Sequence, residues 1–387
     1  MNPIYSLVII VPATIVAYFL SRRDEPENFK RYQNLDGLRG FAALFVFVSH
    51  ASLFYFLDTT GSWRFPRSDF GNNFYNQCGS GAVTMFFMMS SFLFYGKIRE
   101  NPIIDWKRVY ASRITRLFPM YYLSCLLGLS IVWLYRQNNH ITMDNVLHIL
   151  AFNGVGNMLG VENVPLMTNG TAWTLPYEWL LYLSLPLIWV VVQGKKDILA
   201  ILFSLALLLV LVKYAQFLHL DYKLCLIFVT GMMAYEMTKF KVQKIKKLAS
   251  GLWGSLGLVF AGILVVGLSF YSSGHPLEAN NSISWPISLL LYSFIFFIIT
   301  LGNNFFGVLT SAAARKLGEI SYSFYLLQFI FLNLFFRILF TKNMPVLEHF
   351  VLASLSCITL LLVSNITFSH VEKRFMVKSG SWGKHKI

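Results

Sequence analysis

Long apolar runs alternate with short polar segments along the chain. A helix rises about 1.5 Å per residue, so about 20 apolar residues cross the ~30 Å hydrocarbon core of a membrane. This pattern predicts about eleven membrane-spanning helices. They are expected at 3–20, 37–57, 80–96, 117–135, 173–193, 197–217, 222–238, 252–271, 283–302, 319–340 and 347–369. Residues 145–159 are also apolar, but asparagines and glycines interrupt them, which predicts a re-entrant or interfacial segment.

The composition favours the same class of protein. The 387-residue chain is 56% hydrophobic and only 13% charged, whereas soluble chains have about 25% charged residues. The predicted fold is therefore an all-α, polytopic transmembrane bundle. The first apolar run follows no basic stretch and is interpreted as a retained span rather than a cleaved signal peptide. The four cysteines have no ligand or disulfide spacing, so no metal site is predicted.

The formal net charge of +14 is spread over short segments between the apolar runs. This distribution indicates membrane orientation and argues against a nucleic-acid partner. With the N-terminus outside, most of the 32 lysine and arginine residues fall in cytoplasmic segments, as the positive-inside rule requires. The C-terminus is then expected in the cytoplasm.

Two ionisable side chains inside predicted spans are candidates for a functional site. His50 falls in the second span, and Glu178 lies near the outer end of the span at 173–193. The predicted orientation places both in the outer half of the membrane, where such groups usually mark a functional site. The alternative is a histidine that a neighbouring helix satisfies.

A basic pair begins the span at 117–135. Arg113 and Arg116 are three residues apart, so they share one face of a helix. Planar guanidinium groups suit the recognition of phosphate. The alternative is that both side chains only extend toward lipid headgroups.

Five stretches, in this order, carry a family resemblance: Leu35–Ala43 followed by His50, Gly81–Ser90, Arg113–Tyr121, Ala172–Tyr182 and Ile320–Gln328. Together they resemble the motifs of the acyltransferase-3 family of membrane acyltransferases. The chain departs from that pattern at Ser91, where the family usually has glycine, and at Gln328, where it often has histidine. It also carries one span more than the family's usual ten.

The resemblance implies transfer of an acyl group, commonly acetyl, from cytoplasmic acyl-CoA to a hydroxyl at the outer face. Acetyl-CoA or another acyl-CoA would be a substrate, and no cofactor would be bound permanently. The acceptor would be a glycan or lipid-linked glycan, such as a surface polysaccharide. The implied location is the plasma (inner) membrane of a bacterium, with membrane lipid as a partner.

The resemblance also implies a division of the chain and a set of roles. Residues 1–33 would form the extra span and a basic linker, 34–372 the acyltransferase domain, and 373–387 a basic cytoplasmic tail. His50 would act as general base or transient acyl carrier, and Glu178 would orient it or bind the acceptor. Four residues would bind acyl-CoA: Arg39, Arg113, Arg116 and Tyr122. Four would support the site: Asp36, Ser90, Trp173 and Tyr182. Gln328 is left out of the catalytic set.

A multi-span transporter or flippase of a glycan or lipid-linked substrate is the alternative function. It would also place charged residues in a membrane cavity. Polar intramembrane residues concentrate in the first half of this chain, whereas a transporter often has repeated halves. This asymmetry favours the enzyme. The acceptor, the acyl chain and the oligomeric state do not follow from the sequence.

Overall fold

The computed structural model describes residues 1–22, 32–66, 69–138, 140–150, 157–194, 206, 209–213, 216, 220–240, 243–274, 284–339 and 344–376. In these residues the regular structure is helical, apart from one isolated bridge between Met158 and Val161. The predicted all-α class is therefore confirmed.

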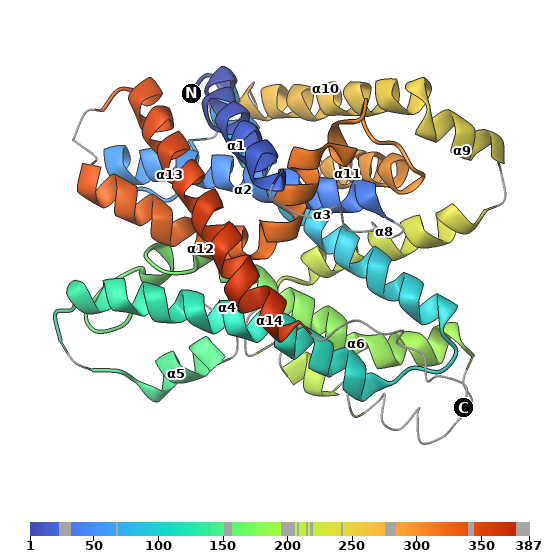
Figure 1. Cartoon of the computed structure of the whole chain (residues 1–387), viewed down its shortest axis with the longest axis horizontal. Coiled ribbons are helices and arrows are strands. Elements are labelled where there is room, and N and C mark those ends of the chain that lie inside the picture. The colour runs from blue at the N-terminus through green and yellow to red at the C-terminus, as the bar shows by residue number, and fades with distance from the viewer. Residues whose placement is uncertain are drawn as a thin grey trace. The chain divides into compact units, whose positions relative to one another are not determined.

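The helices follow one another along the chain as Figure 1 labels them. They are α1 (Ser6–Ser21), α2 (Gln33–Thr60), α3 (Phe70–Glu100), α4 (Trp106–Leu134), α5 (Met143–Leu150), α6 (Leu175–Val192), α8 (Tyr222–Lys239), α9 (Gln243–Ser250), α10 (Leu252–Gly274), α11 (Ser284–Thr300), α12 (Ala312–Leu339), α13 (Val346–Thr367) and α14 (Lys373–Phe375). Short 3₁₀ helices occur at Pro3–Tyr5, Val164–Leu166, Gly170–Thr174 and Val308–Thr310, and a π-helical turn at Phe368–Glu372.

Eight of the described helices are long and apolar enough to cross a membrane, which identifies an integral membrane protein. Two further predicted spans are also helical, as α8 and α11. Of these, α8 carries three charged residues, and the apolar part of α11, Trp285–Thr300, is shorter. The predicted span at 197–217 falls largely outside the described residues, so the number of spans stays a prediction.

Several helices extend beyond the predicted apolar spans. α4 begins at Trp106 because the carboxylate of Asp105 caps it, accepting a hydrogen bond from the backbone N–H of Arg108 at 3.2 Å. α3 begins at Phe70, within a stretch whose asparagines and glycines resemble a loop. Hydropathy therefore locates the membrane core of a helix, whereas caps and hydrogen bonds set its ends.

The chain forms two compact units. The first unit comprises Met1–Phe86 with Thr238–Phe368, and the second comprises Phe87–Met237 with Ser369–Ile387. α3 contributes its first part to one unit and the remainder to the other. The domain limits at 33 and 372 stay a prediction, and residues 23–31 and 377–387 lie outside the described part.

In the first unit, α2 packs along α12, and α1 packs against α12 and α13. Glycines permit the close approach of α2. A methyl group on Gly40 would lie 2.6 Å from the backbone nitrogen of Gly318 and 2.7 Å from the carbonyl oxygen of Ala314. One on Gly37 would collide with the carbonyl of Leu309. Small residues at such contacts are typical of packed membrane helices.

We expect Gly40→Ala to lower stability by about 1–3 kcal/mol, because backbone atoms of α12 cannot move aside as a flexible side chain can. The matched control is Gly262→Ala on α10, where an added methyl group would meet nothing within 4 Å. Thermal unfolding in detergent measures both variants. Equal midpoints for the two would contradict the close α2–α12 contact.

The second unit brings the remainder of α3 against α8. A methyl group on Gly96 would strike the ring of Tyr235, and one on Gly231 would strike Ser91. The carboxylate of Glu236 on α8 accepts hydrogen bonds from two side chains near the end of α3, Tyr95 at 2.6 Å and Arg99 at 2.7 Å. These contacts fix the last turns of α3, which carry Phe94 and Lys97 next to Arg113 of α4.

Candidate functional site

His50 lies on α2, half-buried, and faces α12. Its Nδ1 is 3.2 Å from Oε1 of Gln328, across 278 residues of sequence. Gln328 is fully buried, and its amide nitrogen donates to the carbonyl oxygen of Tyr325 at 2.9 Å. The close packing of α2 on α12 therefore brings together two polar side chains from opposite ends of the chain.

The hydrogen bonds of Gln328 select one tautomer of His50. Because the amide nitrogen is committed to a carbonyl oxygen, the amide oxygen faces the imidazole and can only accept. Nδ1 then carries the proton, and Nε2 holds the lone pair. A neutral imidazole with a defined basic nitrogen is the form that general-base chemistry needs.

Aromatic rings surround the imidazole. The Phe329 ring lies 4.7 Å from it between centroids, and Trp63 lies 6.2 Å away in a stacked orientation. Trp63 can reach His50 because Gly61, the residue that caps the end of α2, has a φ of 70° and turns the chain back. The left-handed conformation of that cap favours glycine. Trp63 also contacts Phe54 edge-on at 5.3 Å and Phe329 at 5.5 Å, so neighbouring rings hold it in place.

Asp36 and Arg39 form an ion pair near the start of α2, with Oδ1 and Nη1 3.7 Å apart. The Arg39 side chain is 24% exposed and that of Asp36 is 49% exposed. The pair is therefore partly screened and contributes little to stability. Arg39 belongs to the first unit, whereas the other predicted donor-binding residues belong to the second.

In the second unit, Arg113 on α4 packs its guanidinium over the ring of Phe94, 5.1 Å from the centroid. Lys97 lies over the same ring at 5.9 Å. The charges of Lys97, Arg113 and Arg116 act on one another. Three cations from two helices thus lie within electrostatic range, and an anion bound there would relieve their repulsion.

One carboxylate accompanies these cations. Glu178 on α6 accepts a hydrogen bond from the hydroxyl of Tyr182 at 2.6 Å, and its charge acts on Arg113. The Tyr182 ring lies 4.9 Å from Phe94. The structure therefore brings Glu178, Tyr182 and Arg113 together.

Three further predicted site residues belong to the second unit and are partly exposed. Tyr122 is half-buried, with its ring 5.6 Å from Phe118. Trp173 is 40% exposed and lies edge-on to Tyr177 at 6.0 Å. Ser90 is half-buried on α3.

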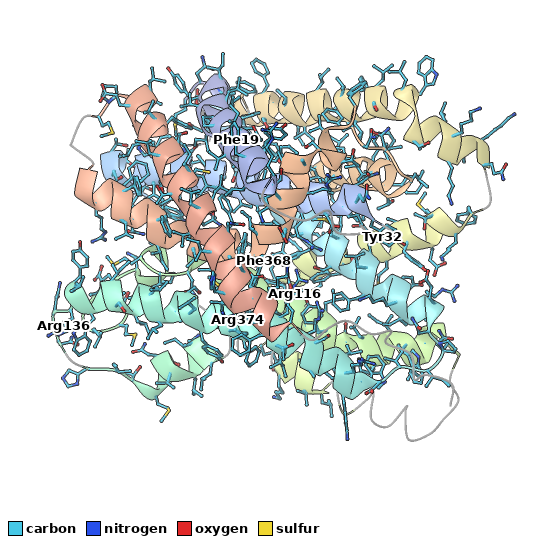
Figure 2. The ribbon with its side chains drawn as sticks, in the orientation of Figure 1. Phe19, Tyr32, Arg116, Arg136, Phe368 and Arg374 are labelled. Atoms are coloured by element: carbon cyan, nitrogen blue, oxygen red, sulfur yellow. The ribbon has the colours of Figure 1, made fainter. Side chains whose placement is uncertain are left out.

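A further cation lies near the basic pair of α4. Helix α14 contacts α4, and Figure 2 labels Arg116 and Arg374 on these two helices. Sequence reasoning assigned Arg374 to a tail and Lys97 to membrane orientation. It also left out Gln328, although a buried amide within an apolar run was the signal that could have found it.

Comparisons with known proteins identify relatives. A family model described as an acyltransferase domain matches residues 32–368. A protein of Acidianus two-tailed virus, named "Putative acetyltransferase ORF330", is 31% identical over 165 residues, which are 42% of this chain and 43% of that protein. The chain thus matches less than half the length of that relative. No solved structure matches the chain significantly.

Proposed function

Because this chain belongs to the acyltransferase-3 family, we propose that it is a membrane acyltransferase that moves an acyl group from acyl-CoA to a hydroxyl of an extracytoplasmic glycan. Acetyl is the proposed acyl group, and His50 is the proposed general base. The observation that carries the proposal is the bond between His50 and Gln328, which leaves Nε2 of a half-buried imidazole as the basic nitrogen. The family favours a transferase over a transporter or flippase.

In the proposed step, the acceptor hydroxyl attacks the thioester carbonyl carbon. A C–O bond forms, the C–S bond breaks, and the hydroxyl proton passes to Nε2 of His50. The imidazolium then gives this proton to the departing CoA thiolate, which leaves as the thiol. Because the proton of the acceptor hydroxyl ends on the CoA thiol and His50 is neutral again, the reaction consumes only the donor and the acceptor.

We propose that the cations of the second unit bind the phosphates of the donor. Lys97, Arg113 and Arg116 supply the positive charge, and charge-assisted hydrogen bonds from guanidinium to phosphate are among the strong ones. Tyr182 and Glu178 would then hold Arg113 in place. The prediction that Glu178 orients His50 stays a prediction, because the two residues belong to different units.

The rings around His50 support a glycan acceptor. Trp63 is half-buried beside the imidazole and offers an apolar face together with an N–H donor. A sugar ring has both an apolar face and hydroxyl groups, so it can stack on the Trp63 ring and accept a hydrogen bond from the indole N–H. The proposed location is the bacterial plasma membrane, with the N-terminus outside and the C-terminus in the cytoplasm.

Replacing Gln328 tests its positioning role. We expect Gln328→Leu to lower kcat about tenfold, because the Nδ1–H then lacks its acceptor and the tautomer is no longer selected. The dissociation constant of the donor should stay unchanged. Gln328→His, which restores a group able to accept, should recover much of the rate. If both variants lose stability and rate alike, the residue is only structural.

The function itself is tested in cells. A bacterial host expressing the chain should acquire alkali-labile acyl esters on its envelope glycans, detected by mass spectrometry of the purified glycans. The matched control expresses His50→Ala at the same level in the membrane. Equal ester content in both strains would contradict the proposal.

A further inference from the structure

A pocket of about 600 Å³ opens in the first unit, and four short stretches of chain line it. They are the start of α2 at Tyr32–Leu35, the end of α8 at Thr238 and Lys239, Lys246 on α9, and the end of α11 at Ile299–Gly302. The function proposed above uses none of these residues.

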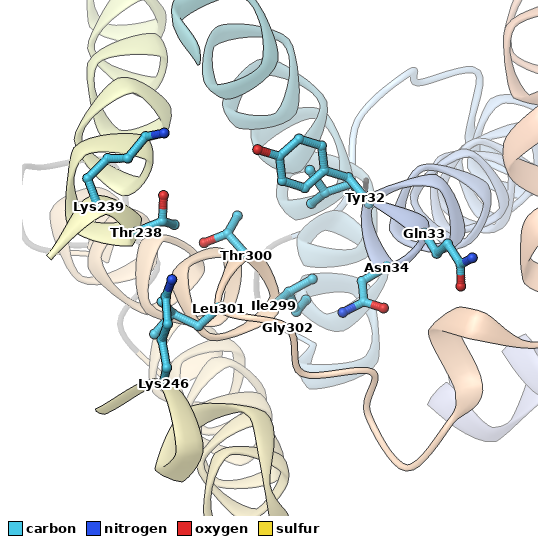
Figure 3. A pocket seen from close by; sticks show the side chains of 11 residues that line it. Tyr32, Gln33, Asn34, Thr238, Lys239, Lys246, Ile299, Thr300, Leu301 and Gly302 are labelled. Carbon is cyan, nitrogen blue, oxygen red and sulfur yellow. The ribbon is translucent and has the colours of Figure 1, made fainter. Parts of the chain in front are cut away.

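The pocket is basic. Lys239 and Lys246 come from different helices and line the same space, which Figure 3 shows together with Thr238, Thr300 and Tyr32. Tyr32 and Thr238 carry hydroxyl groups, whereas the hydroxyl of Thr300 donates to the carbonyl oxygen of Phe297 at 2.8 Å. None of the described residues that line the pocket is acidic. Two ammonium groups from different helices around one cavity suit a phosphate group.

The surroundings favour a phosphate carried by lipid. α9 exposes apolar side chains next to its lysines, with Ile245 51% and Leu248 57% exposed, and Trp253 follows at 69%. A short helix with both kinds of exposed side chain is typical of the membrane–water interface. Basic pockets between helices on the cytoplasmic side bind lipid headgroups, and the charge pattern of the sequence assigns this side to the cytoplasm.

We infer that this pocket binds a phosphate group, supplied by the headgroup of an anionic phospholipid. The bound phosphate would join the start of α2 to α9 and to the end of α11. It would therefore stabilise the beginning of the helix that carries His50. The inference does not depend on the proposed function, because it concerns binding alone.

The amount of lipid retained by the purified protein measures how strongly the pocket binds a headgroup. The purified full chain is reconstituted in phosphatidylcholine nanodiscs with or without phosphatidylglycerol, and native mass spectrometry measures the lipid retained after release. The test variant is K239Q/K246Q, and the control is K244Q/K247Q, which removes two exposed lysines of α9 that do not line the pocket. We expect affinity for phosphatidylglycerol to fall at least about tenfold in the test variant and less than about twofold in the control.

Soluble ligands distinguish the source of the phosphate. Inorganic phosphate, CoA and 3′-dephospho-CoA are titrated against the same variants. If the test variant loses a soluble ligand but keeps phosphatidylglycerol, the phosphate site stands and its source is soluble. Equal losses in the test and control variants, or wild-type binding of every ligand by K239Q/K246Q, would overturn the inference. Should K239Q/K246Q fail to fold, the single variants Lys239→Gln and Lys246→Gln take its place. Arg113→Gln should leave phosphatidylglycerol retention unchanged, so failure of this inference is distinguishable from failure of the proposed function.

Discussion

Replacing His50 by alanine is expected to lower the rate of acyl transfer by about 10²–10⁴-fold. The acceptor hydroxyl is a weak nucleophile, and without the imidazole no positioned group takes its proton. Steady-state release of CoA thiol in the presence of acceptor measures the rate, and equilibrium titration measures the dissociation constant of the donor. The donor constant should not change.

His50→Gln is the matched second variant, because it retains a polar side chain of similar reach and removes the basic nitrogen. His50→Gln should leave the unfolding midpoint near that of wild type, because its amide can still donate to the buried Gln328. His50→Ala removes the hydrogen-bond partner of that buried amide and should lower the midpoint modestly. A variant that transfers acyl groups at the wild-type rate would exclude His50 as the base. A loss of rate that only parallels a loss of folded protein would assign it a structural role.

Replacing Arg113 by glutamine is expected to weaken donor binding about 10- to 100-fold, because a charge-assisted hydrogen bond to phosphate is worth about 1.5–3 kcal/mol. Arg113→Lys should be intermediate, since it keeps the charge and loses the planar fork. Titration with a non-hydrolysable acyl-CoA analogue measures the dissociation constant. The rate at saturating donor should fall much less.

The control for this prediction is Lys107→Gln. Lys107 is exposed on the same helix, so its removal changes the net charge of the region equally. If Lys107→Gln weakens binding as much as Arg113→Gln, the effect is general electrostatic attraction. If Arg113→Gln binds the donor as tightly as wild type, the cations beside Phe94 only interact with lipid headgroups.

The helices and the candidate base could be predicted from the sequence because each depends on local composition. A histidine within an apolar run is costly in a membrane, and this cost identified His50. The core of α2 was likewise evident from its apolar residues. Its contact with α12 was not, because Gly40 and Gly318 are far apart in sequence and hydropathy does not indicate which helices pair.

The partners of the candidate residues could not be predicted for the same reason. Gln328 is a neutral amide, and only the packing of α12 on α2 brings it to His50. Lys97 lies at the end of a span, where a lysine ordinarily sets orientation. Trp63 lies outside the apolar run of α2, and only the turn at Gly61 places it beside the imidazole.

The most direct measurement follows a labelled acyl group during a single turnover of the wild-type protein. Purified enzyme in nanodiscs is mixed with [¹⁴C]acetyl-CoA and an envelope glycan, quenched at intervals, and separated into protein, donor and glycan. Direct transfer with His50 as base predicts that label passes from the donor to a base-labile ester of the glycan, and that none stays on the protein. Label that accumulates on His50 first would contradict direct transfer, and a donor left intact with every hydroxyl acceptor would contradict the proposed reaction.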